Sequence, residues 1–241
     1  MWNLWHGCRK YSAGCKNCYV YRRDGKYDVD STKVRKTANF LLPVAKMRDG
    51  SYKYPAGTCF MTCFTSDFFI EDADAWREEA WDMIRERSDC TFEFITKRIV
   101  RFGDCMPPDW GEGWDNVVIG CTVENNAEAK RRMPLFVAAP IKHRFVCCEP
   151  LLEKTDISEW LGKEIELVIA GGESGDNARE CDFDWIKDLR RQCEDAKVAF
   201  RFKQTGAIFR KDGRYYSVPR KLQHVQAVKA GIDYMPDKGA E

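Results

Sequence analysis

The sequence predicts an α/β protein built as a partial or complete parallel (β/α) barrel of the TIM type, with about six or seven strands. Short apolar runs rich in β-branched and aromatic residues recur along the chain. Each run is followed by polar residues and then by a helical or irregular stretch. No glycine-rich phosphate loop follows the early runs, which disfavours a doubly wound nucleotide-binding sheet.

Each expected strand is a short run of apolar residues. The runs Val117-Val118-Ile119 and Leu167-Val168-Ile169-Ala170 have the continuous apolar character of parallel strands that are buried on both faces. One further strand is expected within Met1–His6. The six clearest strands are expected at Thr58–Phe64, Thr91–Ile95, Asn116–Cys121, Arg144–Cys148, Glu166–Ala170 and Ala199–Phe202.

Two stretches between these strands have the periodicity of amphipathic helices. Residues 73–87 and 183–194 repeat apolar side chains at helical spacing, with charged side chains between them. Both helices are expected to cover the sheet. The stretch Ala127–Ala139 contains Pro134, which predicts a short or kinked helix there.

The 241 residues are expected to form a single domain, residues 1–241, with a cysteine-bearing loop at 5–19 and a turn-rich insertion at about 22–56. A hydrophobic share of 44% is enough for one large core. Basic and acidic residues number 39 and 38, so overall composition does not indicate a nucleic-acid-binding protein. Residues 1–53 differ, because they hold 12 basic and four acidic residues and are suited to a phosphate-bearing partner.

The chain is expected to be cytoplasmic and to have no membrane partner. No stretch approaches the ~20 apolar residues of a membrane span, and the polar start is unlike a signal peptide. In a reducing compartment the twelve cysteines are expected to be buried, reactive or bound to metal. Nine are scattered, several of them in apolar runs typical of core residues. The other three, Cys8, Cys15 and Cys18, form a cluster.

This cluster predicts a metal centre. Six residues separate Cys8 from Cys15 and two separate Cys15 from Cys18, a gap that lets neighbouring thiolates converge on one centre. A structural zinc site normally has four protein ligands, whereas a four-iron cluster on three cysteines leaves one iron open. Two alternatives stay open: a zinc site with a remote fourth ligand, and three unrelated core cysteines. The candidate fourth ligands are His6, Cys59 and Cys63.

Polar residues follow each expected strand, and the carboxyl ends of barrel strands are where functional side chains lie. Glu149 and Lys203 are the most informative of them, because both adjoin apolar runs and are costly to bury unpaired. A hydrolytic barrel that uses Glu149 and Glu173 is therefore one further hypothesis. The strand-end residues are Thr65-Ser66-Asp67, Thr96-Lys97-Arg98, Thr122 with Glu124, Glu149, Gly172-Glu173-Ser174 and Lys203-Gln204.

The chain also resembles a known family. The opening Trp2-Asn3-Leu4-Trp5-His6-Gly7-Cys8, together with Ser12, Gly14-Cys15 and Cys18-Tyr19, is similar to the three-cysteine-motif proteins of phages and prophages, which are relatives of radical S-adenosylmethionine (radical SAM) enzymes. The similarity spans most of the chain. It continues through Ser66-Asp67-Phe68-Phe69, Thr96-Lys97-Arg98, Thr122-Val123-Glu124-Asn125, Glu149-Pro150-Leu151-Leu152, Gly171-Gly172-Glu173-Ser174-Gly175 with Arg179, and Phe202-Lys203-Gln204.

This resemblance implies a 4Fe-4S cluster on Cys8, Cys15 and Cys18, with S-adenosyl-L-methionine bound at the open iron and cleaved to a 5′-deoxyadenosyl radical. It also implies an electron donor such as a flavodoxin or ferredoxin. Most radical SAM enzymes have three residues between the first two cysteines, where this chain has six. A nucleotide or nucleic-acid base is the expected substrate class.

The resemblance also implies roles by position along the barrel. Ser66 and Asp67 would bind the SAM amino group, Thr122 and Glu124 would approach the ribose, and Tyr19 would lie near the adenine. The later strand ends, Glu149, Glu173 and Lys203, would face the substrate and act as catalytic residues.

The alternative function is a zinc- or cluster-stabilised nucleic-acid-binding protein. It would use the basic N-terminal segment with tyrosines interleaved among its charges. The residues concerned are Arg22, Arg23, Lys26, Lys33, Arg35 and Lys36, with Tyr19, Tyr21 and Tyr27.

Overall fold

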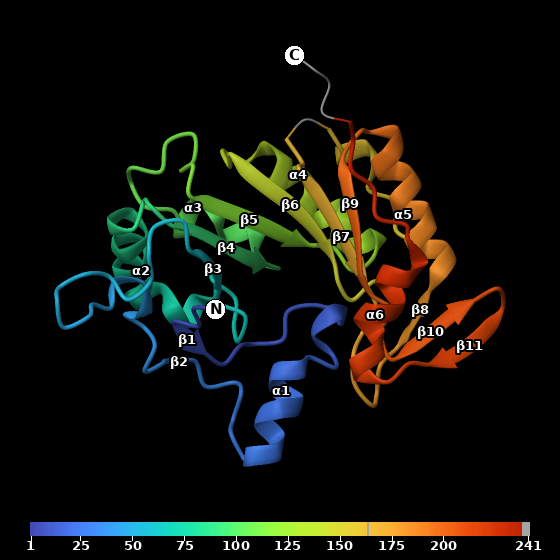
Figure 1. Cartoon of the computed structure of the whole chain (residues 1–241), viewed down its shortest axis with the longest axis horizontal. Coiled ribbons are helices and arrows are strands. Elements are labelled where there is room, and N and C mark those ends of the chain that lie inside the picture. The colour runs from blue at the N-terminus through green and yellow to red at the C-terminus, as the bar shows by residue number, and fades with distance from the viewer. Residues whose placement is uncertain (163, 238–241) are drawn as a thin grey trace. The chain divides into compact units, whose positions relative to one another are not determined.

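The computed structural model describes residues 1–162 and 164–237. Its largest sheet has six strands in the order β3-β4-β5-β6-β7-β9 (Figure 1). Strands therefore lie beside one another in the order of the chain, unlike a doubly wound sheet, in which the order reverses. This is the strand order of a partial parallel (β/α) barrel, and the predicted fold class is confirmed. The strands are β3 (Cys59–Thr62), β4 (Thr91–Thr96), β5 (Val117–Thr122), β6 (His143–Cys148), β7 (Leu167–Gly171) and β9 (Ala199–Gln204).

All six expected strands are present, with bounds within two residues of those expected from the sequence. The apolar runs explain this agreement, because alternate side chains of each run are buried; β4 has one buried and one partly buried face. In β5, for example, Val117, Ile119 and Cys121 are all at most 1% exposed.

The chain divides into two compact units. The first comprises Met1–Tyr11, Val20–Gly120 and Ala139–His143. The second comprises Ser12–Tyr19, Cys121–Ala138 and Arg144–Glu241. The cysteine loop is thus shared, with Cys8 in the first unit and the other two cluster cysteines in the second.

In the first unit, β3 and β4 pair in parallel and have helix α2 (Asp74–Glu86) between them in the chain. Aromatic rings fill the core here, and the rings of Phe68 and Phe94 stack with centroids 4.5 Å apart. Other elements of this part of the chain are β1 (Trp5–His6), α1 (Tyr19–Asp24), β2 (Arg35–Lys36) and α3 (Phe102–Cys105), with 3-10 turns at Gly25–Tyr27, Leu42–Val44, Glu71–Ala73 and Ile99–Arg101.

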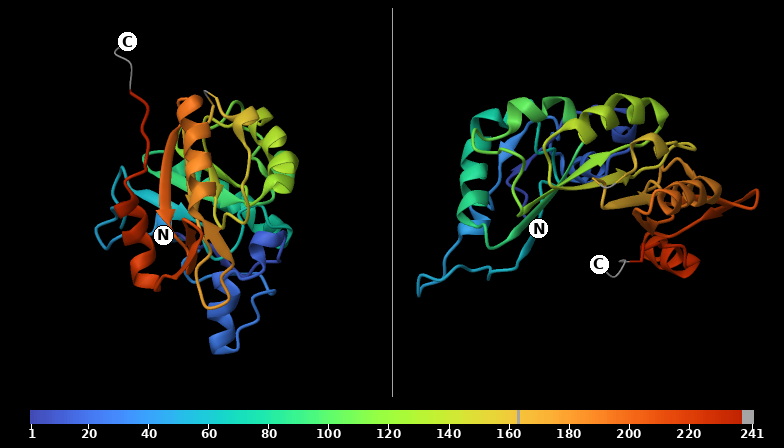
Figure 2. Two further views of the ribbon diagram at one scale, coloured as in Figure 1. Left: turned by 90° about the vertical axis from the view of Figure 1, so that its right-hand side faces the viewer. Right: turned by 90° about the horizontal axis from the view of Figure 1, so that it is seen from above.

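In the second unit, β6, β7 and β9 pair in parallel. Helix α5 (Phe183–Asp195) packs along β7 and β9 (Figure 2). A smaller sheet has the order β11-β10-β8, and helix α6 packs against β9. The remaining elements are 3-10 turns at Ala13–Cys15 and Ser158–Trp160, α4 (Asn126–Ala138), β8 (Glu180–Asp182), β10 (Ile208–Lys211), β11 (Arg214–Ser217) and α6 (Arg220–Ala230).

Of the two alternatives expected at Pro134, a short helix is wrong, because α4 has 13 residues and continues past this proline, while a kink stays a prediction. Proline removes one backbone donor from the helix. Burial of Ala129, Met133 and Phe136 on the inner face of α4 offsets that loss. The side chain of Arg144 also donates to the carbonyl oxygens of the last turn of the helix.

Candidate functional site

The three cluster cysteines differ from the rest in exposure. Cys8, Cys15 and Cys18 are half-buried, while Cys59 is exposed. The other eight cysteines are buried in the core, as the sequence predicts for a cysteine in an apolar run. All twelve are free thiols. The three predicted ligands are thus distinguished from the core cysteines by their partial exposure.

In the first unit, Cys8 is fixed by backbone bonds. The Cys8 amide donates to the Ser31 carbonyl at 2.7 Å, and the Gly7 amide donates to Thr65 at 3.2 Å. Gly7 has φ +98°, and a Cβ atom there would lie 2.4 Å from the Lys33 carbonyl oxygen. This position therefore requires glycine, as expected for a loop that turns tightly beside the cysteine. Predicted site residue Ser66 donates from its hydroxyl to the Gly7 carbonyl at 2.5 Å.

A buried arginine lies beside the Cys8 sulfur. Arg98, two residues beyond the end of β4, has its Nη1 atom 3.9 Å from Cys8 Sγ and 3.3 Å from a carboxylate oxygen of Asp67. Its Nη2 atom donates to the Arg9 carbonyl at 2.8 Å. Burial lowers the pKa of Arg98, but the negative charges of Asp67 and Cys8 outweigh it and raise the pKa above its ordinary value. Positive charge is thus permanently present next to this thiol.

Asp67 is a predicted cofactor-binding residue, and both of its oxygens already accept hydrogen bonds. Oδ1 accepts from the Thr96 hydroxyl at 2.8 Å and from the Phe69 amide at 3.0 Å. Oδ2 accepts from the Lys97 amide at 2.9 Å and from Arg98. The side chain is buried. Its hydrogen bonds link the segment after β3 to the end of β4 and orient the arginine beside Cys8.

In the second unit, the loop before Cys15 is bound to a buried carboxylate. Glu124, just past the end of β5, is fully buried. Its Oε1 accepts from the Gly14 amide at 3.1 Å and from the Ser12 hydroxyl. Its Oε2 accepts from Arg132 of α4 at 2.7 Å. A Cβ atom on Gly14 would lie 2.8 Å from Glu124 Oε1, so the close approach of loop and carboxylate depends on glycine.

The loop between Cys15 and Cys18 is bound to a second carboxylate. The Asn17 side-chain amide donates to Glu173 Oε2 at 2.9 Å and to the Asn177 carbonyl at 2.7 Å. Glu173, just past the end of β7, forms an ion pair with Arg179 at 2.6 Å, and Arg179 also donates to the Ala13 carbonyl at 2.9 Å. Both carboxylates predicted from the strand ends at β5 and β7 therefore contact the cysteine loop.

The charge of Glu173 is stabilised by these contacts. Burial raises the pKa of the Glu173 carboxyl, but hydrogen bonds from the side chain and backbone of Arg179, with a further one from Asn17, outweigh it. The net effect is a pKa below the ordinary value, so the carboxylate is ionised at neutral pH.

Glu149 and Lys203, predicted as catalytic residues, form an ion pair of 2.7 Å between the ends of β6 and β9. The lysine side chain is half-exposed, whereas that of Glu149 is 11% exposed. Burial lowers the pKa of Lys203, but Glu149 outweighs it and raises the pKa above its ordinary value. A Cβ atom on Gly171 would lie 2.8 Å from Glu149 Oε1, so glycine also leaves room for this carboxylate.

Thr122 and Tyr19 complete the predicted set. Thr122 is 1% exposed, and its hydroxyl has no hydrogen-bond partner within residues 1–162 and 164–237. Its carbonyl accepts from Arg132 at 2.7 Å. Tyr19 begins helix α1 and is 47% exposed.

Residues that hold the cysteine loop, directly or through a carboxylate, but were not predicted as site residues include Asn17, Arg98, Arg132 and Arg179. Asn17 and Arg98 lie inside segments with clear signals, the gap between two cysteines and a strand end. Arg132 lies on α4 with no sequence signal, because its importance comes from pairing with a buried glutamate. No group of three or more His, Cys, Asp or Glu side chains among the described residues is arranged to hold a metal ion.

The three candidate fourth ligands of a zinc site, His6, Cys59 and Cys63, lie in three different environments. His6 Nε2 lies 2.8 Å from an oxygen of buried Asp24. Cys59 is exposed on β3. Cys63 is fully buried, and burial raises the pKa of its thiol well above the ordinary value, which disfavours the thiolate form that a metal needs.

The fold and the cysteine loop define an α/β protein with the strand order of a partial barrel and a three-cysteine segment bound to its strand ends. Residues 1–234 match a family described as Protein of unknown function (DUF5131), and the chain belongs to this family. Comparisons with curated proteins and with solved structures gave no match.

No helix in the described part of the chain is both long enough and apolar enough to span a bilayer.

Proposed function

We propose that this chain is a radical SAM enzyme that holds a 4Fe-4S cluster on Cys8, Cys15 and Cys18. One observation carries the proposal: these three thiols are half-buried, while eight of the other nine are in the core. When bound, such a cluster supplies an electron to SAM and yields a 5′-deoxyadenosyl radical that abstracts hydrogen from a substrate. Free thiols throughout the chain agree with a reducing, cytoplasmic setting.

The proposed work of the nearby side chains follows from their contacts. Arg98 places positive charge beside Cys8 and offsets the charge of a thiolate ligand. Glu124 and Glu173 hold the loop that bears the other two cysteines. Since the oxygens of Asp67 and Glu124 already accept several hydrogen bonds, we assign these two residues to positioning of the loop.

Other side chains are the better candidates for contact with SAM or substrate. The buried Thr122 hydroxyl lacks a partner in the described residues and suits the ribose, and the exposed ring of Tyr19 suits the adenine. Ser66, whose hydroxyl bonds to the Gly7 carbonyl, can still accept a hydrogen bond from the SAM amino group. The ion pair of Glu149 and Lys203 offers a proton donor and acceptor to a substrate.

A nucleotide or nucleic-acid base is the proposed substrate class, and a flavodoxin or ferredoxin is the proposed electron donor. Both assignments come from the family resemblance of the sequence.

The test is metal analysis of anaerobically purified, reconstituted protein. We expect a brown protein with about four iron and four sulfide per chain, and release of 5′-deoxyadenosine from SAM under reduction. Cys15→Ala should abolish both results, whereas Cys59→Ala, at an exposed cysteine outside the loop, should leave both unchanged. Colourless protein that carries only zinc after reconstitution would overturn the proposal in favour of a zinc-stabilised nucleic-acid-binding protein.

A further inference from the structure

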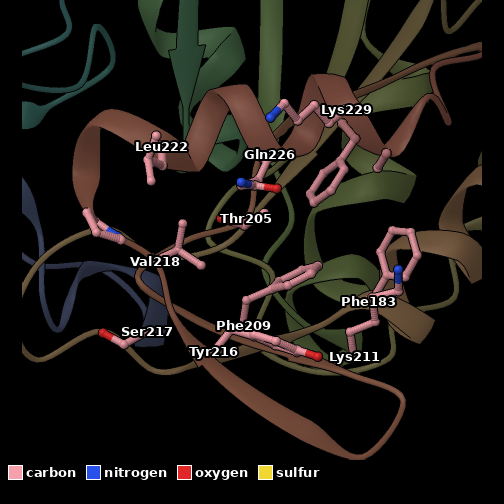
Figure 3. A pocket seen from close by; sticks show the side chains of 13 residues that line it. Phe183, Thr205, Phe209, Lys211, Tyr216, Ser217, Val218, Leu222, Gln226 and Lys229 are labelled. Atoms are coloured by element: carbon pink, nitrogen blue, oxygen red, sulfur yellow. The ribbon is translucent and has the colours of Figure 1, made fainter.

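The second unit contains a groove, and none of the residues that line it is assigned to the cluster or to SAM. It has a volume of about 470 Å³, within the range of small-ligand sites. Helix α6 contributes Leu222, Gln226 and Lys229, and the β10–β11 hairpin contributes Phe209, Lys211 and Tyr216 (Figure 3). We call it the α6 groove.

The floor of the α6 groove is aromatic. Phe183, Phe202 and Phe209 form a cluster with ring centroids 5.8–6.2 Å apart. Phe202 and Phe209 are buried, but Phe183 is only half-buried and Tyr216 is 45% exposed. Phe183, with the flexible Lys187 and Lys211 side chains over its ring, and Tyr216 are therefore the two aromatic side chains that a planar ligand can reach.

The hairpin places basic side chains next to these rings. Phe209 pairs with Tyr216 across the two strands, and Lys211 pairs with Arg214. Because side chains alternate between the two faces of a strand, these four residues share one face of the hairpin. Tyr215 lies on the opposite face. The groove side of the hairpin thus has an aromatic pair followed by a basic pair toward the turn.

The chain segment that forms most of the α6 groove is predominantly basic. Residues 205–230 contain six Lys and Arg and a single acidic residue, Asp212. Lys211 and Lys229 line the groove, and neither has an ion-pair partner in the part of the chain that is described. The Lys211 ammonium lies 5.3 Å from the ring centre of Phe183. An anionic ligand with planar rings complements both features of the groove.

We propose that the α6 groove binds single-stranded nucleic acid, with a base stacked on Phe183 and Tyr216 and the phosphates held by Lys211 and Lys229. Interleaved aromatic and basic side chains are the recognition chemistry of single strands, whose unpaired bases expose both ring faces. A duplex keeps its bases stacked and cannot offer a ring to the groove. This binding needs neither a cluster nor SAM, so it stands or falls independently of the proposed enzyme activity.

The first test measures fluorescence anisotropy of labelled oligothymidylate and oligouridylate of about 12 nucleotides, within the 4–16 that one such site covers. The full chain is expected to bind at about 50 mM salt and to bind a duplex of equal length more weakly. Tighter binding of oligothymidylate would identify the ligand as DNA, and tighter binding of oligouridylate would identify it as RNA. Absence of binding to both, or tighter binding to the duplex, would overturn the proposal.

The second test uses the two neighbouring tyrosines as a matched pair. Tyr216→Ala should weaken binding roughly fivefold to 150-fold, the equivalent of about 1–3 kcal/mol for one stacked base. Tyr215→Ala removes an equally large side chain from the other face of the hairpin, where it is 62% exposed, and should change binding less than about twofold. Equal losses in the two variants would contradict a stacking site in the groove.

The third test distinguishes specific contacts between lysine and phosphate from non-specific electrostatic attraction of the nucleic acid to the protein. Lys211→Gln and Lys229→Gln should each reduce the slope of log K against log salt by about 0.7, as expected for one lost phosphate contact with a single strand. Lys197→Gln, at an exposed lysine of the same unit outside the groove, should leave the slope unchanged. Competition by polyglutamate as strong as that by unlabelled oligonucleotide would show attraction by charge alone and would overturn the proposal.

Discussion

The two halves of the cysteine loop are held in different ways. The half with Cys8 depends on neutral backbone hydrogen bonds and on one buried ion pair, in which Arg98 beside the sulfur pairs with Asp67. The half with Cys15 and Cys18 depends on two buried carboxylates, Glu124 and Glu173, each paired with an arginine. A buried ion pair is costly to break, because the remaining charge has no compensation. The second half is therefore expected to be the more sensitive to single substitutions and to pH.

The largest effect is expected for Glu124→Ala. This change removes the Glu124 partner of buried Arg132, which keeps its ion pair with Glu128 at 2.8 Å, and it removes the acceptor of the Gly14 amide. We expect the free energy of unfolding to fall by about 3 kcal/mol, as for a broken buried pair, and iron content after reconstitution to fall with it. Urea unfolding gives the first quantity and metal analysis the second.

Glu79→Ala is the control for this substitution. Glu79 forms an exposed ion pair with Lys36 in the first unit, and such pairs contribute at most about 1 kcal/mol. If both variants unfold at the same urea concentration, the buried carboxylate does not hold the loop as described.

Glu173 makes the second half sensitive to pH. Its folded-state pKa lies below the ordinary 4.5, so its contribution to stability is present above that value and is lost as the pH falls through the lowered pKa. Glu173→Gln should be about 1–3 kcal/mol less stable than the wild type at neutral pH, and this difference should shrink below about pH 4.5. Unfolding free energies measured from pH 7 to pH 3 provide the check, and a difference that stays constant with pH would be inconsistent with an ionised Glu173.

The fold was predictable because its signal is local. The apolar runs of β5 and β7 are the clearest strand signals, and sequential βα alternation leaves few strand orders to choose from. The hairpin of β10 and β11 was not predicted, although Asp212 and Gly213 give the two-residue turn with positive φ that such hairpins favour. Its two exposed strands lack the apolar runs that identify the main sheet.

The candidate site was predictable in part. The polar strand ends predicted Glu124 and Glu173 as site residues, with expected places near the SAM ribose and the substrate. The sequence could not show that their partners are the loop itself and two arginines. Arg132 lies eight residues beyond Glu124 in the chain, on helix α4, and only the folded chain brings the two together.

Gly14 provides a test of how closely the second half of the loop approaches its carboxylate. Gly14→Ala places a methyl group 2.8 Å from Glu124 Oε1, so the loop or the glutamate must shift, and the other glutamate oxygen is held by Arg132. We expect a loss of about 2 kcal/mol in unfolding free energy, within the range for overpacked sites. Gly25→Ala is the control, since nothing lies within 4 Å of a Cβ atom there. Equal stability of the two variants would mean that the loop shifts without cost.

The smallest expected effects compare the two halves directly through two serines. The Ser12 hydroxyl donates to the Glu124 carboxylate, whereas the Ser66 hydroxyl donates to the neutral Gly7 carbonyl. Hydrogen bonds to charged groups contribute about 1.5–3 kcal/mol and neutral ones about 0.5–1.5. Ser12→Ala should therefore destabilise the protein more than Ser66→Ala, as measured by urea unfolding of both variants. Losses of the same size, or a larger loss for Ser66→Ala, would mean that buried charge does not distinguish the two halves of the loop.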